Sequence, residues 1–318
     1  MKATTLINRY NTESYKLLSL LHEFDKLLGC IKLPTQKRGR PPKLKPETYL
    51  LILLSKEYLG HSLRVAEHVD ADLISRRRVP KSTLNYWEQK PGIRKAIKTI
   101  FSLLSEKLEK LIGYEISVLD STKLTSWLKE LVEMHALLRY KSGVLYLASY
   151  CFTSSQSLAT EKIREGSDFL LADRWYDDKK VLYNVVERGY KPLIRPRGYG
   201  ARGYGAKLRD DLWRDFRLRR LYKLRGVGEG FFGALALWFG QRLTAKKLEV
   251  VKLRLAMRCL LYNLRIWIRC SRLGNEIFEV RILVNYWTLP GSYINSLLAS
   301  FYFILRLEAD RVISYHRH

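Results

Sequence analysis

The chain has 318 residues, which is long for one compact core and suits two or three packed units. Its 57 Lys and Arg residues outnumber its 31 Asp and Glu residues, and the formal net charge of +26 is spread along the whole chain, so a polyanionic partner is expected. The sequence argues against a membrane-spanning segment, because the longest apolar stretch, residues 231–240, is far shorter than the roughly 20 residues that cross a bilayer. No apolar signal segment follows Met1, so a cytoplasmic protein is predicted.

Residues 12–30 are predicted to form an amphipathic helix, because apolar side chains recur there at spacings of three and four residues. Prolines and basic residues interrupt the helical pattern in residues 34–46, which predicts an extended basic linker. Within it, Arg38, Gly39 and Arg40 belong to an Arg-Gly-Arg-Pro segment that resembles an AT-hook, which binds the minor groove of A·T-rich DNA. The alternative is a solvated basic hinge, and both interpretations place the segment near phosphates.

A helix-turn-helix is predicted in residues 62–90, where a basic turn separates two short helical patterns. The second pattern begins near Pro80 and exposes residue types that contact phosphates and base edges. The candidate DNA-binding residues are Arg76, Arg77, Lys81, Thr83 and Asn85, and Arg78 also lies in the turn. A plain helical hairpin with a basic turn is the alternative. With a further helix over residues 100–112, residues 1–110 are predicted to form an all-α DNA-binding region.

The character of the sequence changes near residue 113, where β-branched and aromatic runs replace the helical patterns. Strands are predicted over residues 116–119, 144–152, 169–172 and 191–194, and helices over residues 157–165 and 178–188. Strands that come first and then alternate with helices predict an α/β sheet covered by helices. We assign residues 113–270 to this domain and residues 271–318 to a mostly helical C-terminal extension.

Three acidic residues stand at positions that favour chemistry. Asp120 follows the predicted strand 116–119 and Asp173 follows the strand 169–172, so both carboxylates should emerge at a strand end, where α/β sheets bind ligands. Either aspartate alone is equally well explained as a helix N-cap or a turn residue. Glu229 stands where a basic stretch turns into an apolar helix, at an end expected to be buried. It can complete an oxygen-ligand site for Mg²⁺ or Mn²⁺ that the two aspartates start.

A basic and aromatic segment precedes Glu229. Between Arg195 and Arg225 there are 11 Lys or Arg residues and 3 Asp residues, with Tyr, Trp and Phe interleaved. Cations meet phosphates while aromatic rings stack on opened bases, so the segment is predicted to follow DNA, with Arg195 and Arg197 among its contacts. For residues 207–225 a solvated amphipathic helix is the alternative.

Other kinds of site find little support in the sequence. The glycines at positions 226, 228 and 230 lack the spacing of a nucleotide-binding motif. The four cysteines form no C-x-x-C pair and are predicted to be reduced core residues. The histidines share no metal-ligand spacing.

The three acidic segments together resemble the motifs of insertion-sequence DDE transposases over roughly residues 113–270. A Leu-Asp-Ser-Thr segment ending at Thr122 matches the first motif, and an Ala-Asp-Arg-x-Tyr-Asp segment ending at Asp177 matches the second. The third motif of one branch is Tyr, Arg, Glu and Lys at fixed spacings. Its first three members are present as Tyr222, Arg225 and Glu229, and Ala236 replaces the lysine.

The resemblance implies a ribonuclease H-like mixed sheet flanked by helices, in which Asp120, Asp173 and Glu229 hold two Mg²⁺ or Mn²⁺ ions. It also implies a DNA transposase that cleaves double-stranded DNA at terminal inverted repeats and transfers the strands into target DNA. Such an enzyme would act as a homodimer in a synaptic complex, at the nucleoid of a prokaryotic cytoplasm.

The resemblance further implies that Tyr222, Arg225 and Arg174 bind DNA. Two departures from the pattern are Ala236 and Trp175, the latter at a position where the family commonly has glycine. Two alternatives therefore stay open. One is a catalytically inactive relative that binds DNA sequence-specifically, and the other is a metal-dependent DNA nuclease.

Overall fold

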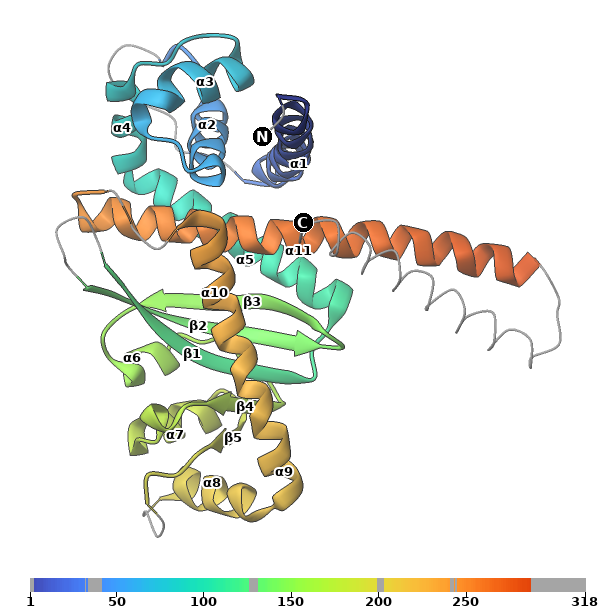
Figure 1. Cartoon of the computed structure of the whole chain (residues 1–318). Coiled ribbons are helices and arrows are strands. Elements are labelled where there is room, and N and C mark those ends of the chain that lie inside the picture. The colour runs from blue at the N-terminus through green and yellow to red at the C-terminus, as the bar shows by residue number, and fades with distance from the viewer. Residues whose placement is uncertain are drawn as a thin grey trace. The chain divides into compact units, whose positions relative to one another are not determined.

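Figure 1 shows the fold of the computed structural model, which describes residues 3–31, 33, 42–125, 131–198, 203–240, 243 and 245–286. The candidate DNA contacts Arg38 and Arg40 lie outside the described residues. The chain divides into two compact units, Met1–Cys270 and Ser271–His318. No helix in the described part of the chain has the length and apolar character needed to cross a membrane.

The N-terminal part of the chain is helical. Pro46 stands in the first turn of α2, where a missing N–H breaks no helical hydrogen bond, and Gly60 ends this helix in the left-handed conformation with a φ of 68°. Ser62 caps α3 by accepting a hydrogen bond from the N–H of Val65 at 3.3 Å. The helices are α1 (Ala3–Leu28), α2 (Pro46–Leu59), α3 (Leu63–Ser75), α4 (Lys81–Gln89) and α5 (Pro91–Ile112). The two helices predicted within residues 62–90 are thus present as α3 and α4.

These helices pack largely through the apolar positions of the sequence pattern. Leu84 and Trp87 of α4 are buried, and Trp87 stacks on Tyr49 with ring centroids 4.6 Å apart. In α3 the apolar residues at helical spacing are not all buried: Ala66 is buried, whereas Val69 is exposed. The buried face of α3 also includes two acidic residues, which periodicity of apolar residues does not reveal.

Helix α5 leads into a mixed sheet of five described strands in the order β3-β2-β1-β4-β5. β1, β2 and β3 are antiparallel neighbours, whereas β4 runs parallel to β1 and β5 runs parallel to β4. Ser142 and Gly143 form the β2–β3 turn with φ values of 47° and 84°, the positive angles that two-residue hairpins favour. The strands are β1 (Ile116–Thr125), β2 (Leu131–Lys141), β3 (Val144–Phe152), β4 (Phe169–Ala172) and β5 (Lys191–Ile194). This arrangement confirms the expected α/β class with a ribonuclease H-like sheet.

Helices cover both faces of the sheet. Side chains of β1 alternate between two core clusters: Ile116 and Val118 pack with α5, α10 and α11, and Leu119 packs with α7 and α8. Asn263 of α11 fastens that helix to β3, because its side-chain amide accepts from Leu147 N–H at 3.0 Å and donates to Leu147 carbonyl at 2.8 Å. The remaining elements are α6 (Gln156–Thr160), η1 (Arg174–Tyr176), α7 (Lys179–Glu187), α8 (Tyr204–Arg214), α9 (Phe216–Leu221), η2 (Tyr222–Gly226), α10 (Val227–Phe239) and α11 (Leu248–Tyr286).

Several sequence predictions are corrected. β1 continues to Thr125 because it pairs with β2, so Asp120 lies inside a strand and not at its end. β2 was not predicted at all. The helix predicted over residues 157–165 is the short α6, which ends at Thr160. Of the four cysteines only Cys259 is buried, and Cys30 is exposed.

Candidate active site

Asp120, within β1, and Asp173, directly after β4, lie at the point where the parallel pairing of these strands ends. β1 and β4 run parallel, and their last paired residues are Leu119 and Ala172. The two aspartates follow these residues directly, and neighbouring strands are about 4.8 Å apart. The structure therefore brings the two aspartates side by side.

Both aspartates belong to the sheet face that α10 covers. Side chains alternate along a strand, and Val118 and Leu171, two residues before each aspartate, pack in the cluster that includes α10. Gly228, in the first turn of α10, lies directly against β1: a Cβ atom on it would be 3.0 Å from Oδ2 of Asp120. The missing side chain at this glycine lets α10 approach the strand and carries the next residue, Glu229, to the aspartates.

The charges of both other acids act on Asp120. Burial is the main cause that raises the pKa of Asp120 above its usual value. The negative charges of Glu229 and Asp173 raise this pKa further, whereas the Ser121 N–H and the Arg225 guanidinium lower it. Coulomb interactions weaken with distance, so both acids are near enough to affect the charge of Asp120. A cation among the three carboxylates would relieve their repulsion.

Glu229 points toward solvent. Its side chain is 68% exposed, and its Oε1 accepts from Nη2 of Arg225, one helical turn earlier, at 3.2 Å. The expectation of a buried acid at this helix end is wrong, because Gly228 and Phe231 are the buried residues of the first turn and Glu229 lies outside their face. The carboxylate is nevertheless free to rotate at the start of α10.

The three carboxylates do not form a closed metal site as they stand. Among the described residues, no group of three or more His, Cys, Asp or Glu side chains is placed so that it could hold an ion. Each acid has a donor of its own: Asp120 accepts from the N–H of Ser121 at 2.9 Å, Asp173 accepts from the N–H of Arg174 at 2.6 Å, and Glu229 keeps its ion pair. The donor set still fits Mg²⁺ or Mn²⁺ in type, because carboxylate oxygens are the ligands that these hard cations prefer.

Tyr222 anchors η2 beside the second aspartate. Its hydroxyl donates to the carbonyl of Ala172 at 3.1 Å, and burial is the main cause that raises the pKa of Tyr222. Asp173 raises this pKa further and the positive charges of Arg225 and Arg195 lower it, so these residues surround the tyrosine. Arg195 and Arg174 are exposed, and their predicted contact with DNA stays a prediction.

Two arginines of the predicted basic segment stabilise the turn after the second aspartate. The guanidinium of Arg197 donates to the carbonyls of Arg174 at 2.9 Å and Trp175 at 2.8 Å, and its backbone N–H donates to Asp177 at 2.6 Å. Arg209 is fully buried in an ion pair with Asp177. Arg209 is therefore not a DNA contact, and protein contacts account for the position of Arg197.

A buried hydrogen-bonded chain beneath the acids escaped the sequence analysis. Nε2 of His135 lies 3.0 Å from the carbonyl of Thr153, so we assign the proton to Nε2, and Nδ1 accepts from the hydroxyl of Tyr176 at 2.7 Å. Burial lowers the pKa of His135, which favours the neutral ring. The Tyr176 hydroxyl also interacts with Ser121, next to Asp120. The chain thus joins η1 to both central strands, and the tyrosine of the second motif was its signal in the sequence.

The N-terminal candidates occupy the turn after α3 and the start of α4. Arg76 ends α3 in the left-handed conformation with a φ of 51°. The side chains of Arg76, Arg77, Lys81 and Asn85 are exposed and that of Thr83 is half-buried. The turn therefore presents cations at the surface, and their contact with DNA stays a prediction.

The two departures from the family pattern both lie near the acids in the chain. Trp175 is exposed in η1 and lies 5.1 Å from the Arg197 guanidinium, measured to the ring centroid. Ala236 is half-buried in α10, and its neighbour Leu237 is 82% exposed. The surface of α10 beyond Glu229 therefore presents an apolar side chain where the family pattern has a cation.

Comparison with known proteins gives a family match for the central segment. Residues 153–264 match the family model described as a transposase DDE domain. This segment contains Asp173 and Glu229, and Asp120 precedes it. No significant match is found among curated proteins or solved structures.

Proposed function

Because residues 153–264 match the family model of a transposase DDE domain, we propose that this chain cuts double-stranded DNA at the terminal inverted repeats of a mobile element and joins the freed ends to target DNA. The placement of Asp120 beside Asp173, with Gly228 of α10 packed against Asp120 and Glu229 as the next residue of that helix, supports the proposal. The strand register supplies Asp120, which the family match does not include. Two adjacent aspartates, one of them raised in pKa by burial and by neighbouring acids, within a chain of net charge +26 call for an explanation, and phosphodiester chemistry gives one.

In this proposal Asp120, Asp173 and Glu229 hold two Mg²⁺ or Mn²⁺ ions, which when bound activate the attacking oxygen and stabilise the leaving 3′-oxygen. Glu229 would have to leave Arg225 to join the aspartates, and its side chain is exposed and held by this one ion pair. Asp120 is half-buried beside two like charges, so its carboxylate gains most from a neighbouring cation. The half-buried aspartates would define the site and Glu229 would complete it.

The cationic side chains around the acids would bind the DNA backbone. Arg225, once released by Glu229, has a free guanidinium beside the cleavage site, and Arg174 and Arg195 are exposed nearby in the chain. Tyr222 is held by Ala172 and keeps η2 in place during this exchange. A homodimer is part of the proposal, because two element ends have to be held together before strand transfer.

A second candidate function is that of an inactive relative that binds DNA without cutting it. The observations that favour it are the ion pair between Glu229 and Arg225 and the alanine at position 236. Both remove a charged group from the position where the transposase reaction requires it.

The experiment uses the full-length chain and a duplex containing the DNA that flanks its gene, where the inverted repeats are expected. With Mg²⁺ present, the wild-type chain should cut at the repeat ends and join them to a second duplex. Asp120→Asn, Asp173→Asn and Glu229→Gln should each slow cutting by about 100-fold or more, because each removes charge stabilisation from the transition state. Binding of the duplex without metal should persist in all three variants.

The matched control is Asp211→Asn, which neutralises an exposed acid on α8 that pairs with Arg214 at 3.5 Å. This variant should cut at the wild-type rate. Cut but unjoined products would support a nuclease, and binding without cutting by the wild-type chain would support the inactive relative. Loss of Mn²⁺ binding in Asp120→Asn, followed by electron paramagnetic resonance, tests the ligand role independently of cutting.

A further inference from the structure

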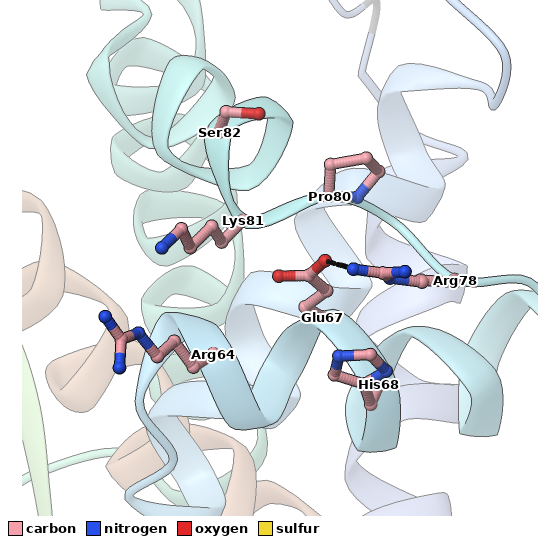
Figure 2. A pocket seen from close by; sticks show the side chains of 7 residues that line it. All are labelled: Arg64, Glu67, His68, Arg78, Pro80, Lys81 and Ser82. Carbon is pink, nitrogen blue, oxygen red and sulfur yellow. Dashed lines mark hydrogen bonds and ion pairs between the residues drawn. The ribbon is translucent and has the colours of Figure 1, made fainter.

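The clearest unassigned cavity lies between α3 and the start of α4, far along the chain from the three acids (Figure 2). The cavity is open to solvent and has a volume of about 470 Å³. Its lining residues are Arg64, Glu67, His68, Arg78, Pro80, Lys81 and Ser82. Three of these residues are cationic, and Glu67 is the single carboxylate among them, so the cavity suits an electron-rich ligand.

Glu67 fixes the turn that enters α4. Its backbone carbonyl accepts from the N–H of Val79 at 3.3 Å, and its Oε1 accepts from both Nε and Nη2 of Arg78, at 2.9 Å and 2.6 Å. The hydrogen bond from Arg78 is the main cause that lowers the pKa of Glu67, and the N–H of Lys81 lowers it too. Figure 2 shows the carboxylate of Glu67 facing the guanidinium of Arg78 across the turn. The orientation of Arg78 is therefore set by the protein.

The Arg78 guanidinium keeps donors for a ligand. A guanidinium carries five N–H donors, and Glu67 takes one from Nε and one from Nη2. Both donors on Nη1 and the second on Nη2 remain, and they form the outer edge of the fork. The side chain of Arg78 is 67% exposed, and Arg78 also lines a neighbouring cavity of about 380 Å³ with Thr83 and Tyr86. An ion pair this exposed contributes little to stability, so its fixed geometry calls for another explanation.

Two further cations stand on the opposite wall. In Figure 2, Arg64 and Lys81 extend in the same direction, away from the pair of Glu67 and Arg78. Within the described part of the chain, neither of these two side chains has an acidic partner. Unpaired exposed cations beside an oriented arginine match the way DNA-binding proteins combine backbone contacts with base contacts.

We propose that this cavity is a DNA-reading site, in which Arg78, oriented by Glu67, reads a guanine from the major groove while Arg64 and Lys81 bind the adjacent phosphates. Two neighbouring donors of one guanidinium match O6 and N7 of guanine, and this pairing is the commonest base-specific contact of arginine. The inference rests on the proposed function, since it assumes that DNA is the substrate. It adds the residue that selects the sequence.

The test separates base reading from phosphate binding. The full-length chain, without divalent metal, selects duplexes from a library with a randomised central segment. The wild-type chain should enrich sites with guanine at a defined position. Arg78→Lys keeps the charge but loses the two-donor edge, so the preference at that one position should fall about 5- to 150-fold while the other positions are unchanged. Glu67→Ala, which frees Arg78, should weaken the same preference.

Arg94→Lys is the matched control, because Arg94 also pairs with a glutamate, Glu249, but lies on α5 and does not line the cavity. Its selected sequences should equal those of the wild type. Arg64→Ala and Lys81→Ala should each lower the slope of log Kd against log salt concentration by about 0.9 on all sequences. Circular dichroism checks that each variant is folded. If Arg78→Lys leaves every position unchanged, the inference is overturned while DNA binding stands. If the wild-type chain binds no duplex, the inference and the proposed function both fall.

Discussion

Gly228 is the residue on which the approach of α10 to the acids depends. A Cβ atom there would be 3.0 Å from Oδ2 of Asp120 and 3.3 Å from Cγ1 of Val118. Neither neighbour can easily move, because Asp120 and Val118 belong to the central strand β1. A side chain at this position would therefore displace either Asp120 or the start of α10 with Glu229.

We predict that Gly228→Ala lowers the rate of DNA cutting by about 10- to 100-fold, since a displacement on the order of 1 Å in a catalytic group has this effect. Gly233→Ala is the control, because Gly233 lies on the same helix and an added Cβ there has no atom within 4 Å. This variant should cut at the wild-type rate. Its free energy of unfolding should rise by about 0.5–1 kcal/mol, since alanine favours a helix more than glycine does. Cutting rates and urea denaturation measure the two effects. Normal cutting by Gly228→Ala would refute the tight contact.

At this scale the sequence predicts the adjacency of the two aspartates better than it predicts the environment of each acid. Asp120 and Asp173 were selected because they follow apolar runs, and the parallel register places them together. The exposure of Glu229 was predicted wrongly, because an apolar helix pattern does not tell which of its residues face the sheet. The contact of Tyr176 with His135 joins residues that are 41 positions apart, and no local pattern reports such a pair.

At the scale of elements, strands of β-branched and aromatic residues were predicted well and β2 was missed. Residues 131–141 consist largely of Leu, Met, Glu and Ala, which favour helices when considered alone. The tight turn at Ser142 and Gly143 and the pairing with β1 and β3 override this local preference. The polar residues His135 and Arg139 further disguise the strand, although both are buried.

A buried ionic cluster joins the N-terminal helices to α11. Arg254 donates to both carboxylate oxygens of Glu88, at 2.6 Å and 3.0 Å, and Lys56 lies 3.7 Å from the same glutamate. Glu57 pairs with Arg258 at 3.3 Å and with Lys56 at 2.7 Å. Three elements, α2, α4 and α11, thus share one desolvated network. The sequence offers no sign of it, because residues that pair directly in it are up to 201 positions apart.

We predict that Glu88→Ala lowers the free energy of unfolding by about 3–5 kcal/mol, because Arg254 and Lys56 then stay buried with less compensating charge. Glu249→Ala, which removes the exposed partner of Arg94, is the matched control and should cost at most about 1 kcal/mol. Urea denaturation of the full-length chain compares the two. Equal losses would mean that the network contributes no more than a surface pair.

For the whole molecule, the net charge of +26 does not show which cations can contact DNA, because some are buried and others are exposed. Several cations are buried in ion pairs with the protein's own acids and cannot contact a phosphate. They are Lys56, Arg139, Arg209, Arg254 and Arg258. By contrast, Arg219 and Arg220 of α9 are exposed, lie over the ring of Phe216, and directly precede η2 with Tyr222.

We therefore predict that the positions of the exposed cations, and not the total charge of the chain, govern DNA affinity. Replacing Arg219 and Arg220 together by alanine should reduce the slope of log Kd against log salt concentration by about 1.8, which corresponds to two phosphate contacts on B-form DNA. Replacing Lys98 and Lys110, two exposed lysines of α5, changes the charge equally and should leave the slope close to that of the wild type. Fluorescence anisotropy of a labelled duplex at several salt concentrations gives both slopes. If the two double variants lower the slope equally, the chain attracts DNA through its overall field, and the segment that leads to Glu229 has no special role in holding the strand.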